Sequence, residues 1–76
     1  MRELIEYVAR SLVDEPAAVE VREVQTTPTT VYQLQVATND VGKVIGKHGR
    51  TAHSLRLLLS ATAARAGRKA VLEIKE

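Results

Sequence analysis

The first clear hydrophobic pattern, in residues 2–13, places an apolar residue at every third or fourth position, which is the spacing of one face of an α-helix. Charged residues occupy most of the positions between them. Pro16 ends the pattern, because the residue before a proline is displaced from helical geometry. We therefore predict an amphipathic helix whose core-facing residues are Leu4, Ile5, Val8 and Leu12.

Three later segments alternate apolar and polar residues, as strands with one buried face do. They cover residues 18–25, 31–38 and 68–76, and the turn TTPTT separates the first two. In the first segment the alternation slips between Val21 and Val24, a shift that a β-bulge would absorb. The pattern predicts three strands.

Two further helices are predicted between the second and third strands. A short one covers residues 40–45, with Asn39 or Asp40 as its N-cap, and a long one covers residues 50–66 and ends at Gly67. The sheet-facing side of the long helix is predicted to consist of Leu55, Leu58, Leu59, Thr62 and Ala66.

The element order α-β-β-α-α-β predicts one α+β domain over residues 1–76, with three helices packed on one face of a three-stranded sheet. A chain of 76 residues has a small core, so we expect association with a partner to contribute to stability. There is no cysteine, and two histidines cannot form a metal site alone. No apolar run reaches transmembrane length, so we expect a cytoplasmic protein without metal, cofactor or membrane contact.

Charge is distributed unevenly along the chain. Residues 1–40 carry three basic and seven acidic side chains, a net charge of −4, whereas residues 41–76 carry eight basic and two acidic ones, a net charge of +6. No carboxylate occurs between Val41 and Leu72. Such a cationic half is suited to a polyanion, although a solvated basic helix has the same composition. We interpret three of these charges simply as solvated, namely Arg65, Arg68 and Lys69.

The short and long helices are separated by Gly46-Lys47-His48-Gly49. A glycine inside a helix costs about 1 kcal/mol relative to alanine, so two of them indicate a required break. Without Cβ atoms, the loop can bring backbone amides close to an anion at the N-terminus of the next helix. Lys47 and His48 can reach phosphate oxygens. The segment predicts a phosphate-binding loop, but it matches neither a Walker loop nor the G-x-G-x-x-G pattern.

The sequence VGKVIGKHGRTA at residues 41–52 resembles the V-G-x-[IV]-I-G-x-x-G-x-x-[IA] signature of KH domains, whose GxxG loop clamps about four nucleotides of single strand. The helix on each side of the loop and the element order are similar to the type II KH fold. In that fold an extra helix and strand precede the shared core. The resemblance extends over essentially the whole chain and is strongest to the small stand-alone bacterial KH proteins of the KhpA type.

The resemblance implies binding of single-stranded RNA in a groove beside the loop, by a post-transcriptional regulator or RNA chaperone. By position, the residues that would hold phosphates are Gly46, Lys47, His48 and Gly49. Gly42 and Ile45 would line the apolar wall of the groove, and Arg50 and Lys43 would add contacts to the RNA backbone. The family also implies a larger RNA-binding partner that carries its own KH domain.

A second stripe on the long helix is not explained by packing on the sheet. Its members are His53, Leu57, Ala61 and Ala64. Small residues beside one leucine allow a second helix to approach closely, so we expect a homodimer through this stripe. The alternative is that Leu57 lies at the edge of the core.

The leading interpretation is a non-enzymatic RNA-binding protein. Tyr7 and Tyr32 are the only aromatic residues, so the chain lacks the stacking platform of RRM and OB-fold proteins, and bases would contact an aliphatic groove instead. The alternative is a protein-interaction module that assembles with a larger KH-containing partner, with RNA contact secondary. An enzyme is not indicated, because neither His48 nor His53 has catalytic partners at a recognisable spacing, and no small-molecule substrate is expected.

Overall fold

The computed structural model describes residues 1–76 and confirms the predicted element order. The elements are α1 (Arg2–Leu12), η1 (Pro16–Ala18), β1 (Glu20–Gln25), β2 (Thr29–Gln35), η2 (Thr38–Asp40), α2 (Val41–Ile45), η3 (Lys47–Gly49), α3 (Arg50–Arg65) and β3 (Lys69–Lys75). η1 and η2 are single 3₁₀ turns, whereas η3 contains His48 in a left-handed conformation. β2 begins earlier than predicted, because Thr29 and Thr30 pair with β3 instead of belonging to the turn.

β2 is the central strand of the sheet, which has the order β1-β2-β3. β1 pairs with it antiparallel and β3 pairs with it parallel. The parallel pairing is possible because α2 and α3 return the chain to the end of the sheet where β2 began. The predicted bulge in β1 is wrong, since the register runs without interruption from Glu20 to Gln25. Val24 instead faces solvent and is 44% exposed.

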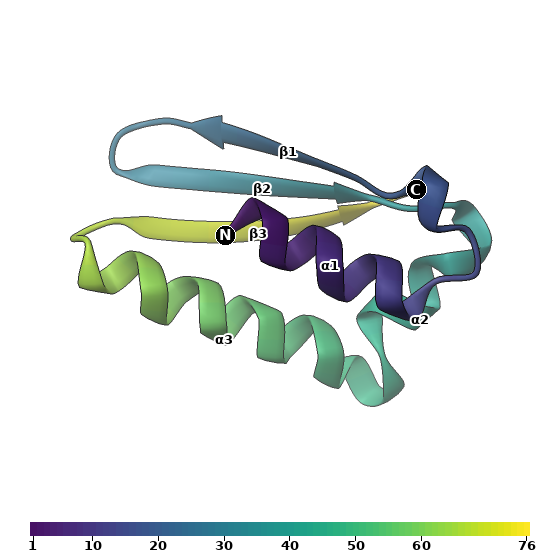
Figure 1. The fold of residues 1–76 in the computed structure, drawn as a ribbon. Helices are drawn as coiled ribbons and strands as arrows, with labels where there is room; N and C mark the ends of the chain where they lie inside the picture. Colours follow the sequence, from purple (N-terminus) through teal and green to yellow (C-terminus); the bar gives the residue numbers. More distant parts are fainter.

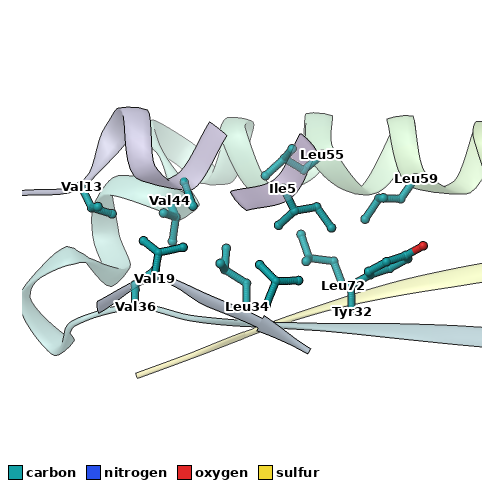
Figure 2. Packing of buried hydrophobic residues seen from close by; sticks show 12 residues of the cluster. Ile5, Val13, Val19, Tyr32, Leu34, Val36, Val44, Leu55, Leu59 and Leu72 are labelled. Carbon is teal, nitrogen blue, oxygen red and sulfur yellow. The ribbon is translucent and has the colours of Figure 1, made fainter. Parts of the chain in front are cut away.

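All three α-helices cover the same face of the sheet, as predicted (Figure 1). α3 packs along β3, and α1 packs on β1 and β2. Side chains from both layers point toward one another in the space between them (Figure 2), including the fully buried Ile5, Leu34, Val44 and Leu59. Burial of one such side chain contributes about 1.5–3 kcal/mol. This core therefore fixes α2 and α3, and with them the turn that connects these helices. None of the helices combines the length and apolar composition needed to cross a bilayer.

The predicted core-facing side of α1 is partly wrong. Ile5 and Ala9 are buried, whereas Leu4 and Leu12 are 37% and 40% exposed. Alanine at position 9 lets the helix lie close to the sheet. The two leucines are displaced toward the edges of the face that contacts the sheet.

The predicted sheet-facing stripe of α3 also needs correction. Leu55 and Leu59 are buried, but Leu58 is 46% exposed, and Thr62 and Ala66 are exposed as well. α1 and α3 share one face of the sheet without closing against each other. Leu58 therefore borders a hollow of about 340 Å³ between the two helices, which Val8 also lines.

Candidate nucleic-acid interface

The connection between α2 and α3 is a tight turn formed by residues 46–49. α2 ends at Ile45, and Gly46 follows with φ 81° and ψ 169°, a combination that essentially only glycine adopts. His48 and Gly49 follow with φ values of 57° and 73°. The N–H of Gly49 donates to the carbonyl of Gly46 at 3.0 Å and closes the turn. These conformations redirect the chain so that α3 begins at Arg50, as predicted.

Space as well as backbone geometry requires glycine at position 46. A Cβ atom there would lie 2.9 Å from the backbone nitrogen of Thr51, and closer still to the Thr51 side chain. At Gly42 and Gly49 a Cβ atom would meet nothing within 4 Å. Gly49 still has a positive φ, whereas Gly42 does not. The fold therefore requires Gly46, favours Gly49, and gives no steric reason for Gly42.

The side chains around the turn are basic and unpaired. Lys47, His48 and Arg50 are exposed, and none of them takes part in an ion pair. α3 has no side-chain N-cap and no acidic residue in its first turn. Acidic residues would be stabilising at that end of a helix, so their absence leaves the positive end of the dipole uncompensated. The charge and the free N–H groups at this end of α3 are complementary to an anion.

Asp40, which lies just before α2, is the one charged residue buried in the fold, at 1% exposure. Its carboxylate accepts hydrogen bonds from the backbone N–H groups of Asp14 at 3.2 Å and Glu15 at 3.1 Å, and from Lys43 Nζ at 3.1 Å. The predicted side-chain cap on α2 is wrong, because neither Asn39 nor Asp40 makes such a bond. Asp40 instead ties α2 to the segment that follows α1.

These contacts change the interpretation of Lys43. Its Nζ also pairs with Asp14 at 2.9 Å, and hydrogen bonds to Asp14 and Asp40 raise the pKa of Lys43 above its usual value. A phosphate would have to compete with two carboxylates for this ammonium group. Through these ion pairs Lys43 fixes the orientation of α2 and of the turn that follows it.

Asp40 also links the stability of the fold to pH. Burial acts to raise the pKa of Asp40, but the N–H of Asp14, the ammonium of Lys43 and the N–H of Glu15 outweigh burial and hold this pKa below its usual value. Ionised Asp40 thus stabilises the fold above the unfolded-state pKa of about 3.9. That contribution is lost as the pH falls through the lower, folded-state pKa.

We expect Asp40→Asn to lower the melting temperature at neutral pH by about 5–10 °C, because one amide cannot accept all three hydrogen bonds. Below about pH 4 the difference from the wild type should narrow, because the Asp40 carboxyl is protonated first in the unfolded chain and, at lower pH, in the folded protein as well. Thermal unfolding followed by circular dichroism across this pH range measures both effects. Asp14→Asn is the control. It should lower the melting temperature less, because the Asp14 side chain is 79% exposed. A difference that stays constant with pH would contradict this role of Asp40.

α2 presents outward the two residues that were predicted to line a groove. Val44 is fully buried, whereas Ile45 is 37% exposed and Gly42 is exposed. A partly exposed isoleucine beside a residue without a side chain leaves an apolar patch on the outer side of α2. This surface leads directly into the turn.

The stripe predicted for self-association lies on the solvent side of α3. All of its members are exposed, namely His53, Leu57, Ala61 and Ala64. Leu57 is 59% exposed, so it does not lie at the edge of the core. The outer face of α3 therefore carries an apolar side chain among small ones.

Comparison with known proteins agrees with this architecture. The family described as KhpA/KhpB, KH domain matches residues 2–74. Three similar proteins are each named RNA-binding protein KhpA. That of Chlamydia trachomatis serovar D is 47% identical over 76 residues, which cover 100% of this chain and 97% of the relative.

The relative from Treponema pallidum (strain Nichols) is 53% identical over 72 residues, which cover 95% of this chain and 90% of the relative. The relative from Clostridium perfringens (strain 13 / Type A) is 45% identical over 74 residues, which cover 97% of this chain and 99% of the relative. The likeness spans nearly the whole chain, and the element order is that of a type II KH fold. The chain belongs to the KhpA/KhpB family of KH domains.

Proposed function

We propose that this protein binds single-stranded RNA and holds its phosphate backbone at the turn of residues 46–49. The observation that carries this proposal is the meeting of the uncapped N-terminus of α3 with the unpaired basic side chains of Lys47, His48 and Arg50. The name of the similar proteins supports RNA as the anion. The protein acts by binding rather than catalysis, in post-transcriptional regulation or as an RNA chaperone.

Binding of this kind depends strongly on salt. Each neutralised phosphate of a single strand contributes about −0.7 to the slope of log affinity against log salt concentration. With two or three phosphates held at the turn, affinity falls roughly 7- to 20-fold between about 50 and 200 mM salt.

A substitution at Gly42 tests RNA binding without disturbing the fold. Alanine is favoured over glycine in a helix by about 1 kcal/mol, and the new methyl group meets no protein atom within 4 Å, so Gly42→Ala should not lower the free energy of unfolding. If bases lie against α2, the methyl group keeps them from the backbone, and we expect RNA affinity to fall about tenfold, or about 1.4 kcal/mol. Fluorescence anisotropy with labelled single-stranded RNA and urea unfolding measure the two quantities. If Gly42→Ala binds RNA with unchanged affinity, α2 is not part of the RNA-binding surface.

We also propose that the protein self-associates through the outer face of α3, with a larger KH-containing protein as a second candidate partner. The exposure of Leu57 among His53, Ala61 and Ala64 supports this proposal. An exposed leucine beside small residues suits a two-fold contact between helices. If assembly is the main role, RNA contact is secondary to it.

We expect Leu57→Glu to convert the dimer to a folded monomer, which sedimentation equilibrium measures as a halved mass. Leu58→Glu makes the same change at the next residue, which faces the hollow between α1 and α3. If only Leu58→Glu dissociates the dimer, the dimer interface lies at that hollow and not on the stripe. An unchanged mass for folded Leu57→Glu contradicts the proposed stripe.

A further inference from the structure

Tyr32 is a buried residue whose polar group has no partner in the fold. Its side chain belongs to the core and is only 8% exposed, yet its hydroxyl makes no hydrogen bond to the protein. A buried tyrosine hydroxyl usually finds a partner. Because no fully enclosed polar side-chain atom of the chain lacks one, this hydroxyl reaches open space. Figure 2 shows it pointing away from the other labelled core side chains.

The open space is a pocket of about 170 Å³ between the sheet and the C-terminal part of α3, and Tyr32 is one of its walls. It lies at the end of α3 farthest from the turn of residues 46–49 (Figure 1). The pocket exists because α3 and β3 present small side chains there, namely Ala63, Ala66 and Ala70. Its volume is below the range of about 300–1,000 Å³ that drug-sized ligands occupy, so it suits a molecule of about ten non-hydrogen atoms or fewer.

Arg68 supplies positive charge to this pocket. Its side chain is partly buried, and its Nη2 donates a hydrogen bond to Thr30 Oγ1 at 2.9 Å. It forms no ion pair, and none of the residues that line the pocket is acidic. The interpretation of Arg68 as a solvated charge is therefore wrong. Its guanidinium is held at the pocket, with further N–H groups available to an anion.

The Tyr32 hydroxyl is a hydrogen-bond donor at neutral pH. Burial raises the pKa of Tyr32 above its usual value, Glu23 and Glu3 raise it further, and Arg68 acts to lower it. Both glutamates are exposed and lie outside the lining of the pocket. Since Arg68 influences this pKa, its charge lies within reach of the hydroxyl. The pocket thus combines a cation and a neutral donor with mostly apolar walls.

We propose that this pocket binds a compact monocarboxylate with an apolar body, such as a short aromatic acid. The carboxylate accepts hydrogen bonds from the Tyr32 hydroxyl and the Arg68 guanidinium, and the apolar body lies against the alanines. A carboxylate fits better than a phosphate, because a single cation and one neutral donor face it and the walls offer few further polar groups. The pocket provides no base, so the acid is bound and not converted. This site is separate from the turn and independent of RNA binding.

The test titrates the protein with benzoate at constant ionic strength and follows the backbone amides by NMR. Benzoate has about nine non-hydrogen atoms, so we expect a dissociation constant of about 1–10 mM. Saturable shifts should occur at residues that line the pocket, such as Thr30, Tyr32 and Ala63. Benzamide, which lacks the charge, and acetate, which lacks the apolar body, should each bind about tenfold more weakly or worse.

Two variants with matched controls assign the contacts. Tyr32→Phe removes only the hydroxyl, so it should weaken benzoate binding about threefold to tenfold without lowering stability against urea. Tyr7→Phe makes the same change at a 72% exposed position and should have no effect. Arg68→Gln removes the charge, keeps an amide that can donate to Thr30, and should weaken binding about tenfold or more. Arg65→Gln, at an exposed position outside the pocket, should not.

The absence of saturable shifts in the pocket at about 20 mM benzoate overturns the proposal. Shifts confined to residues 46–49 also overturn it, because the turn alone would then hold the anion. Equal affinities for benzoate and benzamide would show that the pocket does not recognise charge. Unchanged affinity of Tyr32→Phe would show that the hydroxyl contacts only water. Either of these two results contradicts the proposed site as well.

Discussion

Replacement of Gly46 by alanine is expected to lower the free energy of unfolding by about 2–4 kcal/mol, a large effect for an alanine substitution outside the core. Two causes act together. The backbone at φ 81° and ψ 169° is unfavourable for any residue with a side chain, and the new Cβ atom would lie 2.9 Å from the backbone nitrogen of Thr51. Either α3 shifts at its first turn or the loop adopts another conformation. RNA binding should be lost together with stability.

Urea denaturation measures the free energy of unfolding of Gly46→Ala. Gly49→Ala and Gly42→Ala serve as its controls. Position 49 has a positive φ but open space around a Cβ atom, so Gly49→Ala should lower the free energy of unfolding by about 1 kcal/mol. Gly42→Ala should not lower it. Adding Thr51→Ala to Gly46→Ala removes the side-chain contact but not the contact with the backbone nitrogen, so rescue should be partial. Equal losses at positions 46 and 49 would show that contact with Thr51 is unimportant.

The turn could be predicted from the sequence because its signal is local. Two glycines at a spacing of three interrupt a helical pattern, and residues near them in the chain determine the geometry. The three strands and the position of the helices on one face also follow from short-range periodicity and element order, whereas the pairing of β2 with both other strands was not predicted. Element type was therefore predictable, but β2 begins two residues before the predicted segment 31–38 and ends three residues before its end.

The network around Asp40 could not be predicted, because its partners are distant in the sequence. Asp40 and the N–H of Asp14 are separated by 26 residues. An acidic residue before a short helix is ordinarily an exposed cap, and only the return of the chain beside α1 buries it. The consequence for the site is that Lys43, which the resemblance to KH domains placed among the RNA backbone contacts, is paired with two carboxylates.

The exposed positions of Leu58 and Val24 were missed for a related reason. Periodicity indicates which side of an element is apolar but not how much of that side a neighbouring layer covers. α1 and α3 leave a hollow between them, and the face of the sheet on which Val24 lies is not covered by any helix. These apolar positions remain on the surface because the small domain has no further layer to place over them.

The largest effect on RNA binding is expected from Lys47→Asp/His48→Asp. The change removes the ammonium at the tip of the turn and places two carboxylates beside the N-terminus of α3, where they repel phosphate. Aspartate tolerates the left-handed conformation of residue 48, and acidic residues stabilise this end of a helix, so the variant should fold. We expect affinity to fall about 100-fold or more, or about 2.8 kcal/mol.

The most direct measurement is the affinity of this variant for a short single-stranded RNA, compared with that of Arg2→Glu/Gln25→Glu. Both double variants lower the formal net charge by the same amount, with histidine counted as uncharged, but Arg2 and Gln25 lie at exposed positions outside the turn. We predict a loss of about 100-fold for the turn variant and less than about threefold for the control. Equal affinities, or equal losses, would contradict a phosphate site at residues 46–49.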